Sequence, residues 1–354
     1  LIFQSITIGG GYGTGRELVE FFLKRGPLDG LKGMLVAALI WSLILAITFE
    51  LARLTQSFDY RSFIKTLLGR GWWAYEVVYG LGMVLVISVV GSASGEILTE
   101  MTGIANIWGI LLMCFGVGIL AFAGSIWIER ILSFWSIALY VFYFALVLIF
   151  MNTYSESIFH ALKSPEGDGD WLLGGVKYAA YNVGIVPAML YVVRHLHTQR
   201  EALLSGGIAG ILTMIPGFFI YLAMLSQYPG IENEVIPANY LMGQMGIPGF
   251  QLVFQVILFG TLVETGVGII HGFNERISGT FKERGKEFSG LNRLLIAGII
   301  LLIAIYLADV IGLVELIAKG YGALTWGYWI VFLVPVLTYG TYLIVKGMPP
   351  KEKG

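Results

Sequence analysis

The feature that most constrains this chain is a cluster of glycines inside an apolar segment near the N-terminus. Five of the seven residues from 9 to 15 are glycine, and apolar residues such as Leu18 and Phe21 follow directly. Glycine is a poor helix former, and a bilayer tolerates interrupted backbone only where it is buried in protein or lines a polar cavity. The sequence therefore predicts two half-helices that meet at mid-membrane depth, where their free N–H and C=O groups form a site for a small ion or zwitterion.

The composition predicts an all-α integral membrane protein. Hydrophobic residues make up 57% of the 354 residues and charged residues 13%, whereas soluble proteins contain about 25% charged residues. The net charge of −1 gives no reason to expect a nucleic-acid partner. The sequence shows neither a paired nucleophile and base nor a cluster of metal ligands, so we expect no enzyme activity. The expected partners are the lipid bilayer, a small substrate and a coupling ion, H⁺ or Na⁺.

Ten apolar segments can be distinguished, most of them suited in length to one membrane crossing. They divide the chain into two halves of five, residues 1–170 and 171–354. Lys and Arg are concentrated in the loops that would be internal if the N-terminus is cytoplasmic. This predicts a multi-pass protein of the cell inner (plasma) membrane with both termini in the cytoplasm. The segments lie near 1–24, 31–54, 72–100, 105–125, 128–151, 171–195, 203–226, 249–275, 291–310 and 320–346.

The sixth segment carries an interruption that corresponds to the first. Asn182, Gly184 and Pro187 follow one another closely there and weaken a helix at mid-membrane depth. We expect Asn182 and Gly184 in non-helical backbone, with Pro187 restarting the outgoing half-helix. An interrupted helix at the start of each half, with an odd number of helices per half, is typical of an inverted repeat. The alternative is two kinked helices in an ordinary bundle.

Residues 9–22, GGGYGTGRELVEFF, and Tyr-Asn-Val-Gly at 181–184 resemble the YkvI-type amino acid permeases of the amino acid–polyamine–organocation superfamily. The resemblance covers the whole chain in topology and is most specific in the first, sixth and eighth segments. It implies a LeuT-like fold of ten transmembrane helices in a 5+5 inverted repeat, with discontinuous helices 1 and 6. Helices 1, 2, 6 and 7 would form a bundle that rocks against helices 3, 4, 8 and 9.

An α-amino acid is the expected substrate, bound at the first interruption. Its carboxylate would accept hydrogen bonds from N–H groups at the start of the outer half-helix, and its ammonium would donate to carbonyls of both interrupted helices. In related transporters a Gly-x-Gly of helix 1 has this role, which the resemblance places at 13–15. The other interpretation is that the glycines only permit close helix packing. The expected substrate-binding residues are Gly11, Tyr12, Gly13, Thr14, Gly15, Tyr178, Tyr181, Asn182 and Gly184, with Ser88 and Ser92 as the opposite wall.

Arg16 departs from the pattern of the sodium-coupled relatives, which often have an uncharged polar residue at this place. An arginine inside the membrane must find a partner. We favour a structural ion pair with Glu17, Glu20 or Glu96. The alternative is that Arg16 helps to hold a substrate carboxylate.

Glu264 is the expected coupling residue. It lies about 22 Å into the eighth segment, and an ionisable group at such depth usually has a function. The comparison with sodium-coupled members of this fold would place Glu264 and Thr265 opposite the carbonyls of Gly9 and Tyr12 as a sodium site. Otherwise Glu264 carries a proton, which the glutamate itself and Arg16 favour. A third interpretation is that Glu264 only caps the broken helices.

These features predict a secondary active, ion-coupled symporter of amino acids or related small zwitterions that works by alternating access. The alternative is an amino-acid-sensing receptor or channel subunit of the same fold, like the membrane subunits of spore germinant receptors. A coupling residue at mid-membrane depth favours the transporter, because a receptor does not need one. We also expect the loop 227–248, with a short helix around 235–245, to act as an outer lid, and Tyr79 to form part of a gate.

Overall fold

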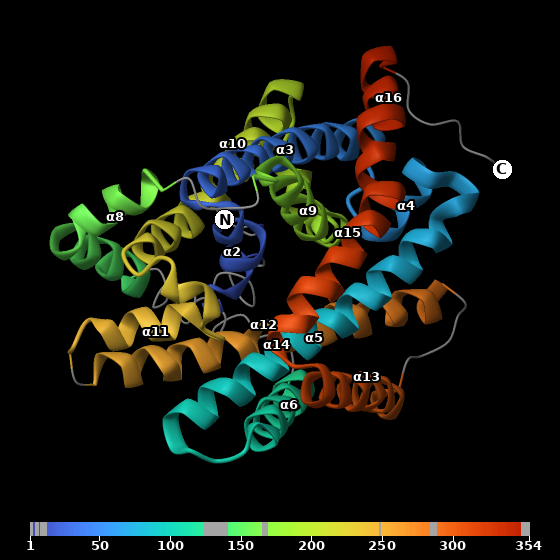
Figure 1. Cartoon of the computed structure of the whole chain (residues 1–354). Helices are drawn as coiled ribbons and strands as arrows, with labels where there is room; N and C mark the ends of the chain where they lie inside the picture. The colour runs from blue at the N-terminus through green and yellow to red at the C-terminus, as the bar shows by residue number, and fades with distance from the viewer. Residues whose placement is uncertain are drawn as a thin grey trace.

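The chain folds into helices joined mostly by short loops (Figure 1). The computed structural model describes residues 3, 7, 13–123, 141–164, 169–247, 249–283 and 289–347. Within these ranges there is no strand, and the predicted all-α architecture is confirmed.

Six helical stretches among the described residues are long and apolar enough to cross a membrane. A seventh is possible if 141–153 and α8, Ser155–Leu162, which meet at a bend of 86°, form one span. A shorter apolar helical stretch, Asn106–Ile119, belongs to α6, Asn106–Ala123. The six are α3 (Pro27–Thr55), α4 (Tyr60–Leu68) with α5 (Trp72–Thr102), α10 (Gln199–Leu225), most of α12 (Phe250–Glu283), most of α13 (Gly290–Ile311), and Leu313–Lys346, which includes α15 (Gly322–Tyr328) and α16 (Thr341–Lys346).

The surface of these helices fits a lipid environment. In α3, Leu35, Leu39 and Leu43 recur every fourth residue and are 61%, 57% and 52% exposed. Residues at this spacing lie on one face of a helix, so α3 presents an aliphatic stripe to its surroundings. A bilayer accommodates such a stripe, whereas water would not. The chain is thus a multi-pass membrane protein, as predicted.

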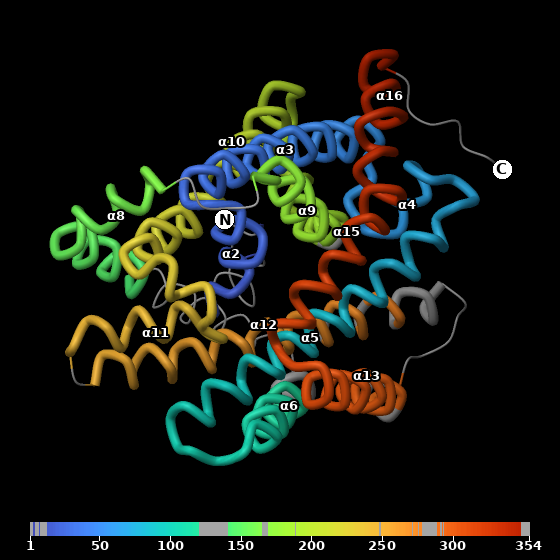
Figure 2. Tube along the Cα trace, viewed as in Figure 1, coloured from blue at the N-terminus to red at the C-terminus, as the bar shows by residue number. Residues whose placement is uncertain are grey.

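The helices form two packed groups, which occupy the upper and lower parts of the views in Figures 1 and 2. In the first, α3 packs against α10 and against α9, Trp171–Val183. In the second, α5 packs against α6, α12 and α13. α15 contacts both α9 and α5 and so lies between the groups. This grouping matches the bundle and the opposing set of helices that the resemblance implies.

Glycines bring α10 very close to α3. A Cβ on Gly210 would lie 2.3 Å from the Ser42 backbone nitrogen, and one on Gly206 would lie 2.5 Å from the Ala46 backbone nitrogen. Two glycines four residues apart leave a flat strip on which a second helix can rest at short distance. The two helices therefore pack backbone to backbone.

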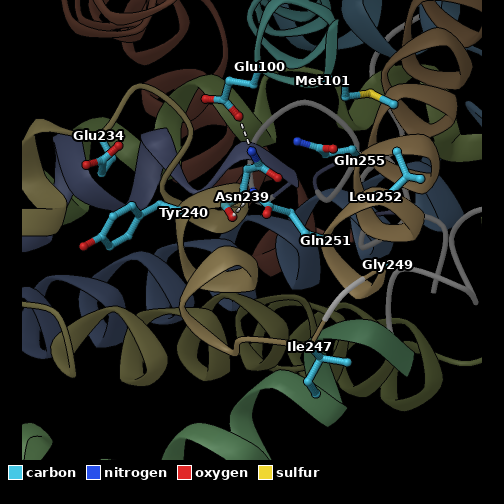
Figure 3. A pocket seen from close by; sticks show the side chains of 10 residues that line it. All are labelled: Glu100, Met101, Glu234, Asn239, Tyr240, Ile247, Gly249, Gln251, Leu252 and Gln255. Carbon is cyan, nitrogen blue, oxygen red and sulfur yellow. Dashed lines mark hydrogen bonds between the residues drawn. The ribbon is translucent and has the colours of Figure 1, made fainter.

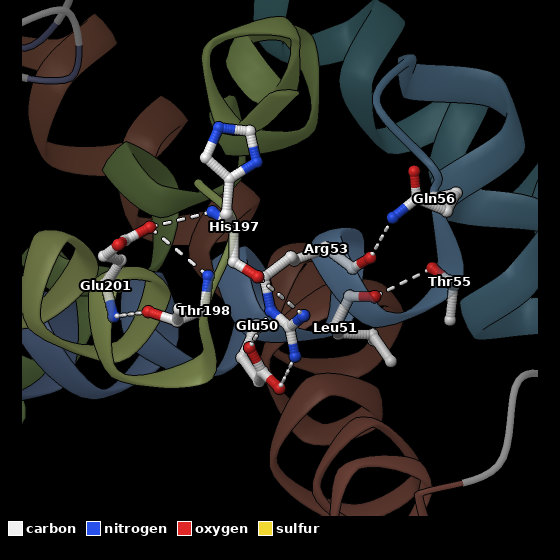
Figure 4. A network of polar contacts seen from close by, with 8 residues as sticks. All are labelled: Glu50, Leu51, Arg53, Thr55, Gln56, His197, Thr198 and Glu201. Carbon is white, nitrogen blue, oxygen red and sulfur yellow. Dashed lines mark hydrogen bonds and ion pairs between the residues drawn. The ribbon is translucent and has the colours of Figure 1, made fainter. Parts of the chain in front are cut away.

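A network of polar contacts joins the end of α3 to the start of α10 (Figure 4). The Arg53 guanidinium donates to both carboxylate oxygens of Glu50 at 2.8 Å, and its Nη1 donates to the His197 carbonyl at 3.4 Å. Thr198 and Glu201 form a reciprocal capping box at the first turn of α10, which satisfies backbone donors that a helix start leaves free. The network fixes the ends of two helices of the same group to each other.

Candidate functional site

α2, Arg16–Phe21, is preceded by a backbone position that glycine occupies without strain. Gly15 has φ +75°, in the left-handed region that disfavours side chains. A Cβ there would lie 2.4 Å from Met224 Cε and 3.2 Å from the Ala238 nitrogen. Gly13 and Thr14 on the preceding side are helical and buried, so Gly15 separates two helical stretches inside the protein.

The Thr14 side chain bonds to the first residue of α2. Its hydroxyl oxygen accepts a hydrogen bond from the Arg16 N–H at 3.2 Å, and the side chain is fully buried. Three other residues of the expected site, Gly9, Gly11 and Tyr12, lie outside the described residues. Their part in substrate or sodium binding stays a prediction.

Arg16 is 3% exposed and is held by groups of two kinds. Its Nη2 lies 3.4 Å from a carboxylate oxygen of Glu20, which confirms the predicted structural pair with that residue. Its Nη1 donates to the carbonyls of Glu232 and Glu234 at 2.8 and 2.9 Å. Lys24 also contacts Glu20, at 2.6 Å. The guanidinium therefore connects α2 to the loop between α10 and α11, Pro237–Gln244.

Glu17 is a buried acid that the sequence analysis considered only as a partner of Arg16. Its side chain is 2% exposed, and its Oε2 accepts a hydrogen bond from the Tyr181 hydroxyl. The Tyr181 ring in turn stacks on Tyr321 with centroids 4.5 Å apart. The signal that could have identified Glu17 is its place, two residues after the helix interruption. Consecutive residues of a helix also point about 100° apart, so Arg16 and Glu17 face different surroundings and need not pair.

Aromatic side chains surround the expected substrate residue Tyr178 of α9. It is fully buried, with ring centroids 4.7 Å from Phe22, 5.5 Å from Trp41 and 5.5 Å from Tyr181. Phe21 lies 5.6 Å from the rings of both tyrosines. The structure thus brings the end of α2 and the middle of α9 together through aromatic packing.

Asn182 does not have the backbone conformation that the sequence analysis predicted. It lies in the last turn of α9, which ends at Val183, and its Nδ2 donates to the Tyr178 carbonyl at 3.0 Å. The amide therefore bonds to the preceding turn of its own helix, and the helix continues past it. The prediction of non-helical backbone at Asn182 was wrong.

Gly184 lies in a turn directly after α9 and outside the helix, as predicted, although its φ of −57° and ψ of −22° fall in the helical region. It was also expected to contact substrate. Its carbonyl accepts a hydrogen bond from the Tyr75 hydroxyl, and a Cβ would lie 2.4 Å from the Tyr328 ring. Gly184 thus serves a tight contact between α9, α5 and α15. Pro187 lies in the first turn of a 3₁₀ helix, η4, Val186–His195, which carries the chain onward.

The other predicted residues lie on α5 and α12. Ser88 and Ser92 are buried in α5, and the Ser88 hydroxyl donates to the Val84 carbonyl at 2.8 Å. Glu264 is 9% exposed within α12, and the Thr265 hydroxyl donates to the Thr261 carbonyl at 3.0 Å. Glu264 is therefore buried in the protein, and its proposed sodium-binding partners on the first helix lie outside the described residues.

Tyr79, the predicted gate residue, belongs to a cluster near the N-terminal end of α5. The Arg276 guanidinium carbon lies 4.5 Å from the Tyr60 ring centroid and 5.1 Å from that of Tyr79, and the same side chain forms an ion pair with Glu76. Tyr75 stacks on Tyr79 at 5.9 Å and also bonds to the backbone after α9. Cation–π contacts and this bond therefore connect α4, α5, α12 and the end of α9.

A pocket of about 470 Å³ opens beside α11. The Asn239 side chain donates from Nδ2 to the Glu100 carboxylate. The Asn239 backbone carbonyl accepts a hydrogen bond from Gln251 Nε2 at 3.4 Å. Figure 3 shows the Gln255 amide directed into the same space. The helix predicted around 235–245 is present as α11, so the loop expected to act as a lid borders this pocket. The lining residues are Glu100, Met101, Glu234, Asn239, Tyr240, Ile247, Gly249, Gln251, Leu252 and Gln255.

Solved structures with this arrangement define the class of the fold. MhsT in complex with L-phenylalanine matches with a TM-score of 0.60 and 15% identity, over 98% of this chain and 97% of that one. A manganese transporter of Eremococcus coleocola matches with 0.62 and 11%, over 97% and 82%. Mhp1 in its inward-facing conformation matches with 0.50 and 17%, over 92% and 72%. These neighbours are LeuT-fold transporters, not enzymes, and the chain has the LeuT-type fold.

Among proteins of known sequence, the chain is similar to the uncharacterized membrane protein YkvI of Bacillus subtilis (strain 168). The two are 24% identical over 289 residues, which cover 80% of this chain and 82% of that protein. The predicted resemblance to YkvI is therefore confirmed. No protein-family model matches the sequence.

Proposed function

We propose that this chain is a secondary active transporter of amino acids or related small zwitterions that works by alternating access. The observation that carries this proposal is the helix interruption at Gly15, buried inside a LeuT-type fold next to α9. Interrupted helices of transporters offer backbone N–H and C=O groups to substrate and coupling ion at mid-membrane depth. The likeness to MhsT, whose structure holds L-phenylalanine, supports an amino acid.

The substrate carboxylate would bind the N–H groups of Thr14 and Gly15, and its ammonium the carbonyls near Gly11 and from 178 to 182. In α9 the Tyr178 carbonyl accepts a hydrogen bond from the Asn182 side chain and the Ala179 carbonyl accepts one from the Trp41 indole at 3.1 Å, in addition to the backbone bonds of the helix. A carbonyl oxygen has two lone pairs, so the ammonium would have to replace one of these bonds or use the other carbonyls. Ser88 and Ser92 would form the opposite wall.

The proposed topology is ten transmembrane helices in two inverted repeats, residues 1–170 and 171–354. Helix 1 is interrupted at Gly15, and helix 6 consists of α9 followed by η4. Both termini would lie in the cytoplasm, at the inner (plasma) membrane, because Lys and Arg are concentrated in the loops on that side. An inverted repeat places the two interrupted helices on opposite sides of one site.

Coupling would use Glu264. We favour a proton over sodium, because Arg16 occupies a position that is uncharged in many sodium-coupled relatives. The sodium alternative would use the carbonyls of Gly9 and Tyr12 with the side chains of Glu264 and Thr265. Either ion shifts the affinity for the substrate by binding more tightly to one conformation.

Uptake into proteoliposomes tests the function. We expect a pH gradient to drive concentrative uptake of at least one of the common amino acids, supplied as labelled compounds. Glu264→Gln, which resembles the protonated acid, should retain exchange of that amino acid but lose concentrative uptake. A sodium gradient that drives uptake at equal pH on both sides would contradict proton coupling. Unimpaired concentrative uptake by Glu264→Gln would remove this residue from the mechanism.

The alternative is a receptor or channel subunit of the same fold that binds an amino acid and signals to partner subunits. Both functions predict that an amino acid raises the unfolding temperature of the purified protein. Only the transporter predicts that the bound amino acid crosses the bilayer. An amino acid that stabilises the protein but is never taken up would favour the receptor.

A further inference from the structure

The buried carboxylate of Glu17 has no part in the function proposed above. It lies in the first turn of α2, is 2% exposed, and accepts a hydrogen bond from Tyr181 of α9. We propose that Glu17 is a proton-binding site that links the start of α2 to the end of α9. Its part in the transport cycle rests on the proposed function, whereas the binding of a proton at Glu17 does not.

Arg16 does not serve Glu17 as a counter-ion in this structure. Its two terminal nitrogens contact Glu20 and the carbonyls of Glu232 and Glu234. Arg16 and Glu17 are consecutive helical residues, so their side chains point about 100° apart. An ionised Glu17 would therefore rely mainly on one neutral hydroxyl, and burying a charge with so little compensation is costly. Binding a proton removes that cost.

The titratable side chains nearest to the Glu17 carboxylate are tyrosines, with Tyr181 bonded to it and Tyr321 stacked on Tyr181. The 3₁₀ turn η2 (Leu23–Arg25), α9, the π-helical turn η6 (Leu316–Tyr321) and α11 pack against α2. η2 carries the cations Lys24 and Arg25, and α9 carries Lys177. α9 contributes Tyr178 and Tyr181 to this contact, and η6 contributes Tyr321. On η6, Lys319 is 80% exposed and pairs with Glu315 at 2.5 Å. On α2 itself, Glu20 pairs with Arg16 and Lys24, and the one ionisable residue of α11 is Tyr240.

The position of Glu17 gives the proton a route to affect the substrate site. Glu17 lies two residues after the interruption at Gly15, and Tyr181 lies two residues before the end of α9 at Val183. When Glu17 is ionised, its two oxygens can only accept hydrogen bonds. When it is protonated, one becomes a donor, and the bond to Tyr181 changes. The same proton thus alters a contact between the two helices that would hold the zwitterion.

Infrared difference spectroscopy on the full-length protein in lipid, between acidic and alkaline buffer, reads this proton directly. We expect a carboxylic acid band in the wild type that is lost in Glu17→Gln and kept in Glu264→Gln. Glu20→Gln is the matched control on the same helix, and it should also keep the band. Tyr181→Phe should shift the frequency of the band, because the hydrogen bond to the carboxyl group is removed.

The proposal is overturned if Glu17→Gln retains every carboxylic acid band of the wild type. If Glu17→Gln cannot be purified in folded form, Tyr181→Phe decides, and an unchanged band frequency overturns the proposal. A lack of amino acid uptake by the wild type would contradict the proposed function alone, because the infrared readout requires no substrate. In a protein that does transport, Glu17→Gln should lose concentrative uptake while exchange continues.

Discussion

At the scale of single residues, Gly15 combines a backbone requirement with a packing requirement. Gly103 has almost the same φ, +76° against +75°, but its surroundings are open. Gly103→Ala should therefore show only the cost of a side chain in left-handed backbone, about 1–2 kcal/mol. Gly15→Ala should cost more, because the methyl group of Met224 must also move. Thermal unfolding of the purified variants measures the difference.

If the two variants unfold at the same temperature, the packing around Gly15 is looser than the structure indicates. Gly15→Ala should also weaken stabilisation by amino acids, whereas Gly103→Ala should not. Equal responses of the two variants to amino acids would move the substrate site away from α2.

At the scale of the elements, α10 offers a matched pair of glycines. A Cβ on Gly210 would meet the backbone of Ser42 at 2.3 Å, whereas a Cβ on Gly207 would meet nothing within 4 Å. Backbone atoms cannot move aside as the end of a side chain can, so Gly210→Ala must push α3 and α10 apart. Overpacking of this kind lowers the free energy of unfolding by about 1–3 kcal/mol. Gly207→Ala should be neutral or stabilising by up to about 1 kcal/mol through helix propensity. Unfolding temperatures of the two variants provide the test.

Because both substitutions add the same methyl group to the same helix, helix propensity is closely matched between them. A Gly210→Ala variant as stable as Gly207→Ala would show that α3 and α10 do not touch backbone to backbone. The pairing of these helices in the first packed group would then need revision.

At the scale of the whole molecule, the crossing formed by α9 and η4 decides the topology. α9 has 13 residues and η4 has 10, which correspond to about 20 Å each. Neither spans a hydrocarbon core of about 30 Å alone, but together they do. Single cysteines at the exposed Lys163 and Arg200, in a Cys114→Ala background, should therefore lie on opposite sides of the membrane. An impermeant maleimide should label Lys163→Cys in intact cells and Arg200→Cys only after permeabilisation.

The reverse pattern would invert the proposed orientation, with both termini outside. Labelling of both cysteines from the same side would show that α9 and η4 turn back within the membrane. The reverse pattern would also change which end of α5 faces the cytoplasm, and with it the side on which the pocket beside α11 opens.

Local sequence was enough to predict an all-helical, multi-pass membrane protein, and it singled out the glycine cluster in which Gly15 has left-handed backbone. Runs of apolar residues predict helices in a membrane because the backbone must satisfy its own hydrogen bonds there. The glycine cluster predicts a break because glycine alone tolerates the backbone of Gly15. The short helix around 235–245 was also predicted, and the structure has it as α11. These properties depend on neighbours in the chain, so one sequence suffices to infer them.

Only the tertiary structure decided what each polar group of the site contacts. Arg16 bonds to carbonyls of residues 232 and 234, and Glu17 bonds to Tyr181. Asn182 remains helical, and its side-chain amide donates to the Tyr178 carbonyl. Composition and spacing do not specify such contacts, because a charged side chain can satisfy itself with any of several distant partners. Which partner is near depends on how α2, α9 and the loop before α11 pack together, and that packing is a property of the whole fold.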